Sequence, residues 1–119
     1  MLASNPLFMS RVNHERNRFI ELMGQAKINH MIYPSKHFFE RVVERNLEAV
    51  DVLRMLVPVI QEFRSTTYNV RSYAIRWKQF TLFALISIGP VTETRRIVLK
   101  TIYDRDIDET GYDVVQRIL

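Results

Sequence analysis

The spacing of the apolar residues changes near the middle of this chain. Up to about residue 57 they recur every three to four positions, whereas between residues 70 and 103 they alternate with polar residues or form short unbroken runs. The first spacing is typical of amphipathic helices and the second of β-strands. Helices followed by strands predict an α+β fold, in which N-terminal helices pack on a three- to four-stranded antiparallel sheet. A length of 119 residues fits a single domain, 1–119.

Three helices are expected before the sheet. Asn5, followed by a proline, predicts the cap of a first helix over about residues 7–27. Ser35 predicts the cap of a second helix, and a third is expected over 48–57, where Pro58 ends or kinks it. Four side chains of the second helix are predicted to face water: Lys36, Glu40, Glu44 and Arg45.

Strands are expected over 70–77, 79–87 and 94–103, joined as an antiparallel meander with the apolar middle strand in the centre. Alternation divides the last strand into two sets that face opposite ways: Ile97, Leu99 and Thr101 against Val98, Lys100 and Ile102. The remaining segment, 111–119, is expected to form a short helix. Four apolar side chains would dock that helix: Val114, Val115, Ile118 and Leu119.

Missing or badly spaced residues exclude several classes of site. The chain has no cysteine, which excludes disulfides, thiolate metal sites and a cysteine nucleophile, and is consistent with a reducing compartment. The three histidines lack ligand spacing and the acidic stretch 104–109 lacks the glycine of a calcium loop, so no metal is expected. No glycine-rich phosphate motif is present, so no cofactor is expected. The apolar runs fall far short of the ~20 residues that cross a bilayer, so we expect a cytoplasmic protein without a membrane partner.

Charged residues are unevenly distributed along the chain. The net charge is +4, but residues 64–100 include seven basic residues and one acid, and residues 104–113 include five acids and one base. A basic sheet face attracts phosphate backbones largely without regard to their sequence, which predicts a nucleic-acid partner. The alternative is a solvated strand face that carries ordinary charges.

His37, Arg41 and Arg45 are spaced four residues apart, so they share one face of the second predicted helix. A histidine can accept and return a proton near neutral pH, and an arginine beside it can grip a phosphate and offset its developing charge. Cleavage of RNA through its own 2′-hydroxyl requires these two groups. Alternatively, the histidine satisfies the start of the helix and the arginines pair with nearby glutamates.

The same stretch resembles a known family. It resembles the RelE/BrnT-type superfamily of small toxin-like ribonucleases in the order of its features. A histidine stands near a helix start, Glu40-Arg41 soon follows, Glu44-Arg45 precedes a break, and a further helix leads into a sheet. Within this superfamily, the pattern is most similar to that of the RegB-like phage endoribonucleases. The resemblance implies helices followed by an antiparallel sheet. It also implies a metal-independent endoribonuclease, phage-encoded or toxin-like, with RNA as its substrate.

The resemblance assigns catalysis to His37 and Arg41. RegB-like enzymes use a second histidine on the next helix, but Val57 stands at that distance here, and only His14 or His30 could replace it. A glutamate of the first helix corresponds to Glu15 or Glu21.

Substrate-binding residues are predicted on the sheet and at the end of the second helix. By resemblance, the RNA backbone is gripped from the sheet by Arg76, Arg96, Lys100 and Tyr103. Arg45, in line with His37, and Lys78, beside Trp77, complete the set. Trp77 and Tyr73 could stack on bases, although core packing is favoured for Tyr73.

Three hypotheses remain open. The ribonuclease hypothesis requires His37 and Arg41 to be exposed in a groove shared with the basic sheet face, and burial of either, or its locking in a surface ion pair, would defeat it. A ribosome or host factor could be a further partner. The alternative is a non-catalytic phage or bacterial regulatory protein of the same fold that binds a host protein or nucleic acid. The third is self-association through Tyr33, Phe38 and Phe39.

Overall fold

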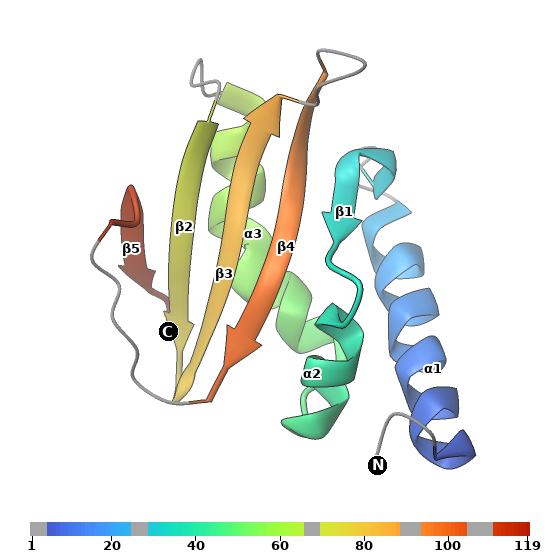
Figure 1. Ribbon diagram of the computed structural model, residues 1–119. Helices are drawn as coiled ribbons and strands as arrows, with labels where there is room; N and C mark the ends of the chain where they lie inside the picture. The colour runs from blue at the N-terminus through green and yellow to red at the C-terminus, as the bar shows by residue number, and fades with distance from the viewer. Residues whose placement is uncertain (1–4, 25–28, 66–69, 89–93, 105–110) are drawn as a thin grey trace.

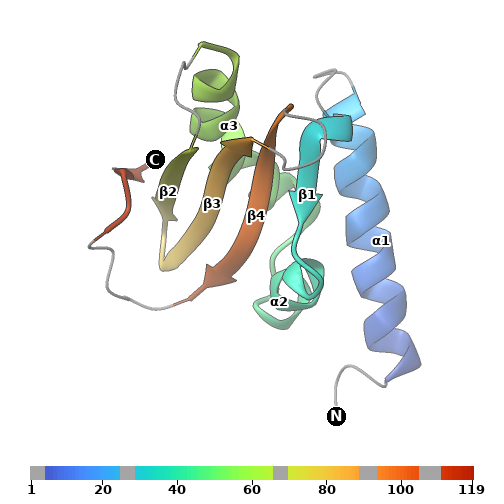
Figure 2. The ribbon, with the colours of Figure 1, turned by 45° about the horizontal axis from the view of Figure 1, so that its top comes forward.

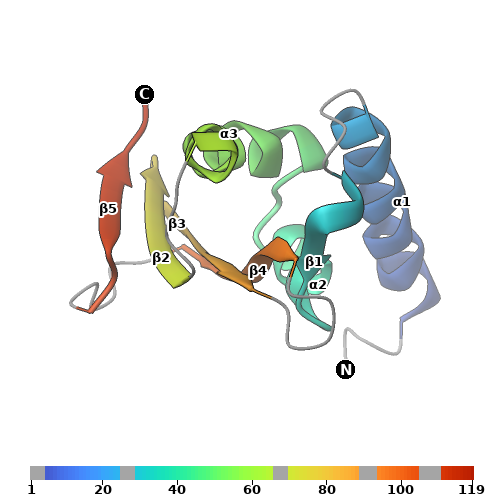
Figure 3. The same cartoon turned by 90° about the horizontal axis from the view of Figure 1, so that it is seen from above.

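The computed structural model describes residues 5–24, 29–65, 70–88, 94–104 and 111–119 of the chain. In these ranges three helices lie on one side of a five-stranded sheet with the order β1-β4-β3-β2-β5. Figure 1 looks onto the face of the sheet that is turned away from the helices, with α3 behind the strands. Seen from above, α1 and α3 stand on the same side of the sheet (Figure 3). The predicted α+β class is confirmed.

The first helix, α1 (Pro6–Met23), starts as predicted. The Asn5 side chain accepts hydrogen bonds from the backbone N–H groups of Leu7 and Phe8 at 2.9 and 3.4 Å, and Pro6 needs no such partner. The helix ends earlier than predicted, and residues 25–28 lie outside the described residues. One apolar stripe is buried: Phe8, Val12, Phe19 and Met23.

The second helix, α2 (Phe38–Glu44), is shorter than predicted, and Ser35 is not its cap. The Ser35 hydroxyl instead donates to the carbonyl of Lys100 at 2.8 Å, and His37 occupies the cap position. The prediction that Glu40 faces water is wrong, because only 8% of this residue is exposed. This two-turn helix packs against both α1 and β4, so two of its sides are covered. Phe38 and Phe39 are 0% and 1% exposed, so the expectation that they form an exposed surface for self-association is wrong, and only Tyr33 of that set is exposed.

The third helix, α3 (Ala49–Ser65), continues through Pro58, so the prediction that it extends only to residue 57 is wrong. Its second half buries Val59 and Phe63, and this burial outweighs the backbone hydrogen bond that Pro58 cannot make. At the start of α3, the N–H of Ala49 donates to the Glu15 carboxylate of α1 at 2.9 Å, so a different helix supplies the cap.

The predicted antiparallel meander is formed by β2 (Val70–Trp77), β3 (Phe80–Ile88) and β4 (Arg95–Tyr103). Two short parallel strands complete the sheet: β1 (Ile32–Pro34) beside β4, and β5 (Val114–Arg117) beside β2. The sheet is therefore mixed, and the prediction of three or four purely antiparallel strands is only roughly met.

The short helix expected over 111–119 is wrong, because β5 forms there instead. The Asp113 carboxylate accepts hydrogen bonds from the backbone N–H and hydroxyl of Ser72, at 2.8 and 3.1 Å, and the Asp113 N–H donates to the same hydroxyl at 3.0 Å. These bonds hold the segment against β2. Val114 packs against the core, whereas Val115 and Leu119 are exposed, so the apolar pattern is only partly buried.

A β-bulge in β4 changes the predicted alternation. Phe83 lies opposite Thr101 and Ala84 opposite Leu99, which leaves Lys100 as the extra residue. Beyond it, Ile102 joins the core, so the prediction that Ile102 shares a face with Val98 is wrong. The same shift turns Tyr103 to the face that carries Arg96.

The helix-covered face of the sheet contains the core, which includes Tyr73 as predicted. We call the opposite face the outer face. On β2, β3 and β4 its residues are Val70, Ser72, Ala74, Arg76, Thr81, Phe83, Leu85, Ser87, Arg96, Val98, Thr101 and Tyr103, and Tyr33 of β1 lies beside Val98 on the same face.

Candidate functional site

The chain brings α2 alongside the second half of β4. β1 pairs with β4 as far as Leu99, and the Ser35 N–H then donates to the Leu99 carbonyl at 2.9 Å. The next residues turn into α2, which stands below β1 and next to the end of β4 (Figure 2). β1 pairs with only the first part of β4, and α2 lies beside the rest of that strand. The predicted residues His37, Arg41 and Arg45 are therefore placed beside the second half of β4.

His37 is hydrogen-bonded through Nδ1 to the carboxylate of Glu40, one turn further along α2. The histidine side chain is 56% exposed and the glutamate side chain 10% exposed. A carboxylate in this position orients the imidazole and favours the tautomer in which Nδ1 carries the proton. Within the described part of the chain, Nε2 has no hydrogen-bond partner. It is therefore positioned to exchange a proton with a bound molecule.

The two arginines of the line contact Glu44. Arg41 donates through Nη1 to both carboxylate oxygens of Glu44, at 3.0 and 3.1 Å. Arg45 lies 3.5 Å from the same carboxylate, and its guanidinium carbon is 5.8 Å from the centre of the Tyr103 ring. Only 17% of the Arg45 side chain is exposed, so it does not face water as predicted. The alternative in which the arginines pair with nearby glutamates thus describes these contacts.

Arg76 and Tyr103 lie in one row across the outer face. Both flank Thr81, since Arg76 is opposite it on β2 and Tyr103 is opposite it on β4. Tyr103 and Tyr112 both contact the Phe83 ring, with centroids 5.9 and 4.7 Å away, and Phe83 is buried although it is on the outer face. Burial raises the pKa of the Tyr112 phenol, and the nearby Tyr103 raises it by a smaller amount. These aromatic rings close one end of the outer face.

A hollow of about 340 Å³ lies at the other end, where β1 and β4 begin. Arg96 stands in it with its guanidinium carbon 4.5 Å from the centre of the Tyr33 ring, and Tyr33 is 46% exposed. Stacking on a ring leaves the in-plane N–H groups of an arginine directed outwards. The lining contains no carboxylate among the described residues: His30, Met31, Tyr33, Thr94, Arg95 and Arg96.

The two ends of the outer face are well separated. Arg96 is opposite Ser87 and Tyr103 is opposite Thr81, so the two rows are six residues apart along β3. At ~3.3 Å per residue this is a distance of about 20 Å. Between the rows, Val98 and Thr101 of β4 and Leu85 of β3 are only half-buried.

Lys78 and Lys100 lie apart from these two rows. Lys78 sits in the turn after β2 with a φ of 53°, and its ammonium is 4.5 Å from the centre of the Trp77 ring. Arg54 lies over the same ring at 4.7 Å and only 8% of Trp77 is exposed, so this ring is poorly placed to stack on a base. Lys100 is the exposed extra residue of the bulge, next to the chain that leads into α2.

Neither of the other histidines accompanies His37. His30 lines the hollow at the far end of β1, and His14 lines a hollow between α1 and α3 with Glu15 and Glu48. Val57 lies on α3, 42% exposed, and Glu15 is used as the cap of that helix. The structure thus does not assemble a second histidine at the His37 site from the residues that it describes.

Two features of the candidate site escape the sequence patterns. Tyr33 and His30 reach Arg96 only because β1 pairs with a strand far along the chain, and Tyr33 has no periodic pattern that marks it. The sole local signal is the proline after Tyr33, which favours an extended backbone.

In the described ranges, no group of histidine, aspartate and glutamate residues is arranged to hold a metal ion, and residues 105–110 of the acidic stretch lie outside these ranges. No described helix has the length and apolarity needed to cross a membrane. Comparisons with protein-family models, curated proteins and solved structures found no match to this chain. The resemblance to RelE-type ribonucleases therefore stays a prediction.

Proposed function

We propose that this protein binds single-stranded RNA along the outer face of its sheet. The observation that carries the proposal is the placement of Arg96 with Tyr33 at one end of this face and of Arg76 with Tyr103 at the other. Arginines at the two ends suit phosphates, and aromatic rings, of which Tyr33 is exposed and Tyr103 half-buried, suit unpaired bases. A span of about 20 Å accommodates several nucleotides.

The charge distribution supports the same proposal. The hollow around Arg96 is lined by cationic and neutral groups in the described part of the chain, and the whole chain carries a net charge of +4. Most of the attraction to a phosphate backbone arises from such charges and is independent of base sequence. We therefore favour the alternative expected from the sequence, a non-catalytic regulatory protein that binds a host protein or nucleic acid, and propose RNA as its ligand. A host protein stays a candidate partner of the same regulator.

A second candidate is the metal-independent endoribonuclease, favoured by the contact between His37 and Glu40. In this proposal, Nε2 of His37 accepts the proton of the 2′-hydroxyl, the 2′-oxygen forms a bond to phosphorus, and the bond from phosphorus to the 5′-oxygen of the next nucleotide breaks. The leaving 5′-oxygen takes a proton from water, and Arg41 binds the phosphate. Arg41 forms a surface ion pair with Glu44, and a pair that locked the arginine in place would defeat this candidate. An ion pair whose side chains are 42% and 27% exposed contributes only about 0–1 kcal/mol, so the proposal requires Arg41 to release Glu44 when RNA binds. This pairing and the absence of a second histidine nearby in the described residues place catalysis second. We also propose that the fold is RelE-like, that the protein is toxin-like or phage-encoded, and that it is cytoplasmic.

Binding is tested by fluorescence anisotropy of a labelled 12-nucleotide RNA at several salt concentrations. We expect Arg96→Gln and Arg76→Gln each to weaken binding and to lower the salt slope by about 0.7, which corresponds to one lost phosphate contact. Arg18→Gln is the matched control, because Arg18 pairs with Glu21 on α1, away from the outer face. Unchanged affinity in both outer-face variants, with unfolding midpoints like that of the wild type, would overturn the proposal.

Cleavage is tested separately on the same RNA in EDTA. If the second candidate holds, the wild-type protein produces fragments with 2′,3′-cyclic phosphate ends, and His37→Ala and Arg41→Ala produce none. Binding without cleavage supports the first proposal alone.

A further inference from the structure

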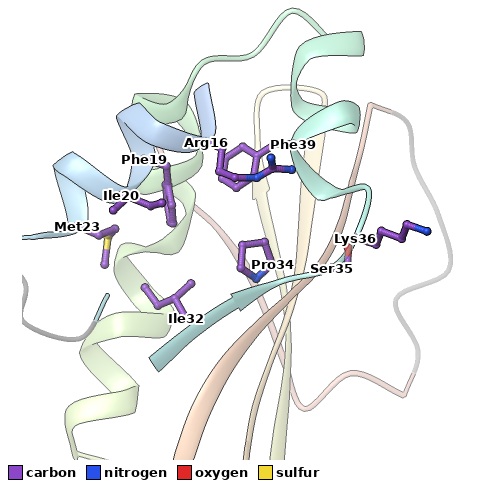
Figure 4. A pocket seen from close by; sticks show the side chains of 9 residues that line it. All are labelled: Arg16, Phe19, Ile20, Met23, Ile32, Pro34, Ser35, Lys36 and Phe39. Carbon is purple, nitrogen blue, oxygen red and sulfur yellow. The ribbon is translucent and has the colours of Figure 1, made fainter. Parts of the chain in front are cut away.

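A second hollow lies on the other side of β1, between that strand and α1. Its apolar floor is formed by Phe19 and Met23 of α1, Ile32 of β1 and Phe39 of α2, all of them buried. Ile20 forms a wall and is 51% exposed. Figure 4 shows these side chains converging on one space, which has a volume of about 370 Å³. This volume lies in the range of sites that bind small molecules.

Two cations stand at the mouth of this groove. The Arg16 guanidinium lies over the Phe39 ring, 5.8 Å from its centre, and donates to the Asn13 side chain at 3.1 Å. Lys36 stands at the entrance near α2, and in Figure 4 its ammonium points away from the apolar floor. Among the residues that the structure describes, no carboxylate lines the groove.

Within the described residues neither Arg16 nor Lys36 has a carboxylate partner, whereas five arginines do. These are Arg18, Arg41, Arg45, Arg54 and Arg71, which pair with Glu21, Glu44, Glu44, Asp51 and Glu62 in that order. Two cations without a counter-charge beside an apolar floor are complementary to a ligand that is apolar at one end and negative at the other.

The strand that borders the groove disfavours a peptide as the occupant. β1 has only three residues, and the last of them, Pro34, has no N–H to donate to an added strand. A small molecule needs no such ladder of backbone hydrogen bonds.

We propose that this groove binds an amphiphilic small molecule made of an alkyl chain and one carboxylate. The chain lies on Phe19, Met23 and Ile32, and the carboxylate meets Arg16. The inference is independent of RNA binding, since none of these residues belongs to the outer face. Each methylene group that the groove buries tightens binding about fourfold.

The test is calorimetric titration of the full chain with decanoate, octanoate and decyltrimethylammonium, each below its micelle concentration. We expect saturable binding of decanoate at a ratio of one to one, about 15-fold tighter than that of octanoate. The cationic amphiphile should bind at least tenfold more weakly. Ile20→Asp should abolish decanoate binding, Arg16→Gln should weaken it at least fivefold, and Arg18→Gln on the opposite side of α1 should leave it unchanged.

Three outcomes would overturn the proposal. They are no saturable decanoate binding to the folded wild type, equal affinity for the two charge types, and binding that survives Ile20→Asp. Because Ile20 is half-exposed, Ile20→Asp is expected to fold, and an unchanged unfolding midpoint checks this.

Discussion

Glu40 is a carboxylate that the fold encloses almost completely, with His37 as its hydrogen-bond partner. Burying a carboxylate is costly unless it is hydrogen-bonded, so the imidazole stabilises the position of Glu40 as much as Glu40 orients the imidazole. The contact therefore has a structural role whether or not the protein acts on RNA.

Replacing His37 by alanine is expected to lower the free energy of unfolding by about 1 kcal/mol, because it leaves Glu40 without its partner. In the double variant His37→Ala/Glu40→Leu most of this loss should disappear, since no buried carboxylate remains. Urea denaturation measures both changes. Arg41→Ala is the control and should cost less, because its partner Glu44 is more exposed than Glu40 and can be solvated by water. A double variant no more stable than His37→Ala would contradict the explanation.

Single residues also show where sequence patterns stop being informative about the candidate site. Arg76 lies on the outer face as alternation alone predicts. Tyr103 reaches that face only through the bulge at Lys100, which reverses the predicted alternation. The contact of Arg96 with Tyr33 depends on a parallel pairing that joins distant segments through three residues of β1. Such a short strand has no periodic signal.

At the scale of elements, α3 is a helix as predicted but extends eight residues beyond its predicted end at residue 57. Proline disfavours the interior of a helix, so the sequence predicts that the helix ends or kinks at Pro58. Val59 and Phe63 nevertheless continue the apolar stripe beyond Pro58 and are buried in the core. Tertiary packing thus overrides a strong local signal. The three central strands were predictable because their alternation and turn residues agree with their packing. β5 was not, since four residues that are mostly exposed carry no strand pattern.

Pro58→Ala is expected to raise the free energy of unfolding by about 1 kcal/mol. A proline inside a helix destabilises the folded state by up to ~3 kcal/mol, so removing it is favourable. Proline also restricts the conformations of the unfolded chain, and losing this restriction offsets part of the gain in stability. Urea denaturation of the variant measures the difference, with Val57→Ala as a neighbouring control on the exposed side of α3. A loss of stability on replacing Pro58 would show that its ring makes packing contacts worth more than the missing hydrogen bond.

For the whole molecule, the sheet is held at one edge by a group that titrates. The hydrogen bonds from the Ser72 backbone and hydroxyl lower the pKa of Asp113 from its ordinary value of 3.8. The pKa of Asp113 is lower in the folded protein than in the unfolded chain. Asp113 therefore stabilises the attachment of β5 fully at pH values above its ordinary pKa. This contribution is lost as the pH falls through the lowered pKa.

We therefore expect acid to release β5 before the rest of the sheet. Hydrogen exchange of the Ser72 and β5 amides, corrected for intrinsic rates, should show constant protection from pH 7 to about 4 and a loss below the lowered pKa, while amides between β3 and β4 stay protected. Asp113→Asn should make the β5 protection independent of pH in this range. Simultaneous loss across all strands would contradict this order of opening.

The two parallel edges of the sheet also affect how the chain reaches its folded state. β2, β3 and β4 follow one another along the chain and meet through short connections, so their pairing closes small loops. β1 must instead find a strand whose residues lie 65 positions further on, and β5 one whose residues lie 41 positions back. Closing long loops costs entropy before any contact is gained. We therefore expect the folding rate to be limited by the pairing of these outer strands with a meander that has already formed. Helix formation should have little effect on the rate.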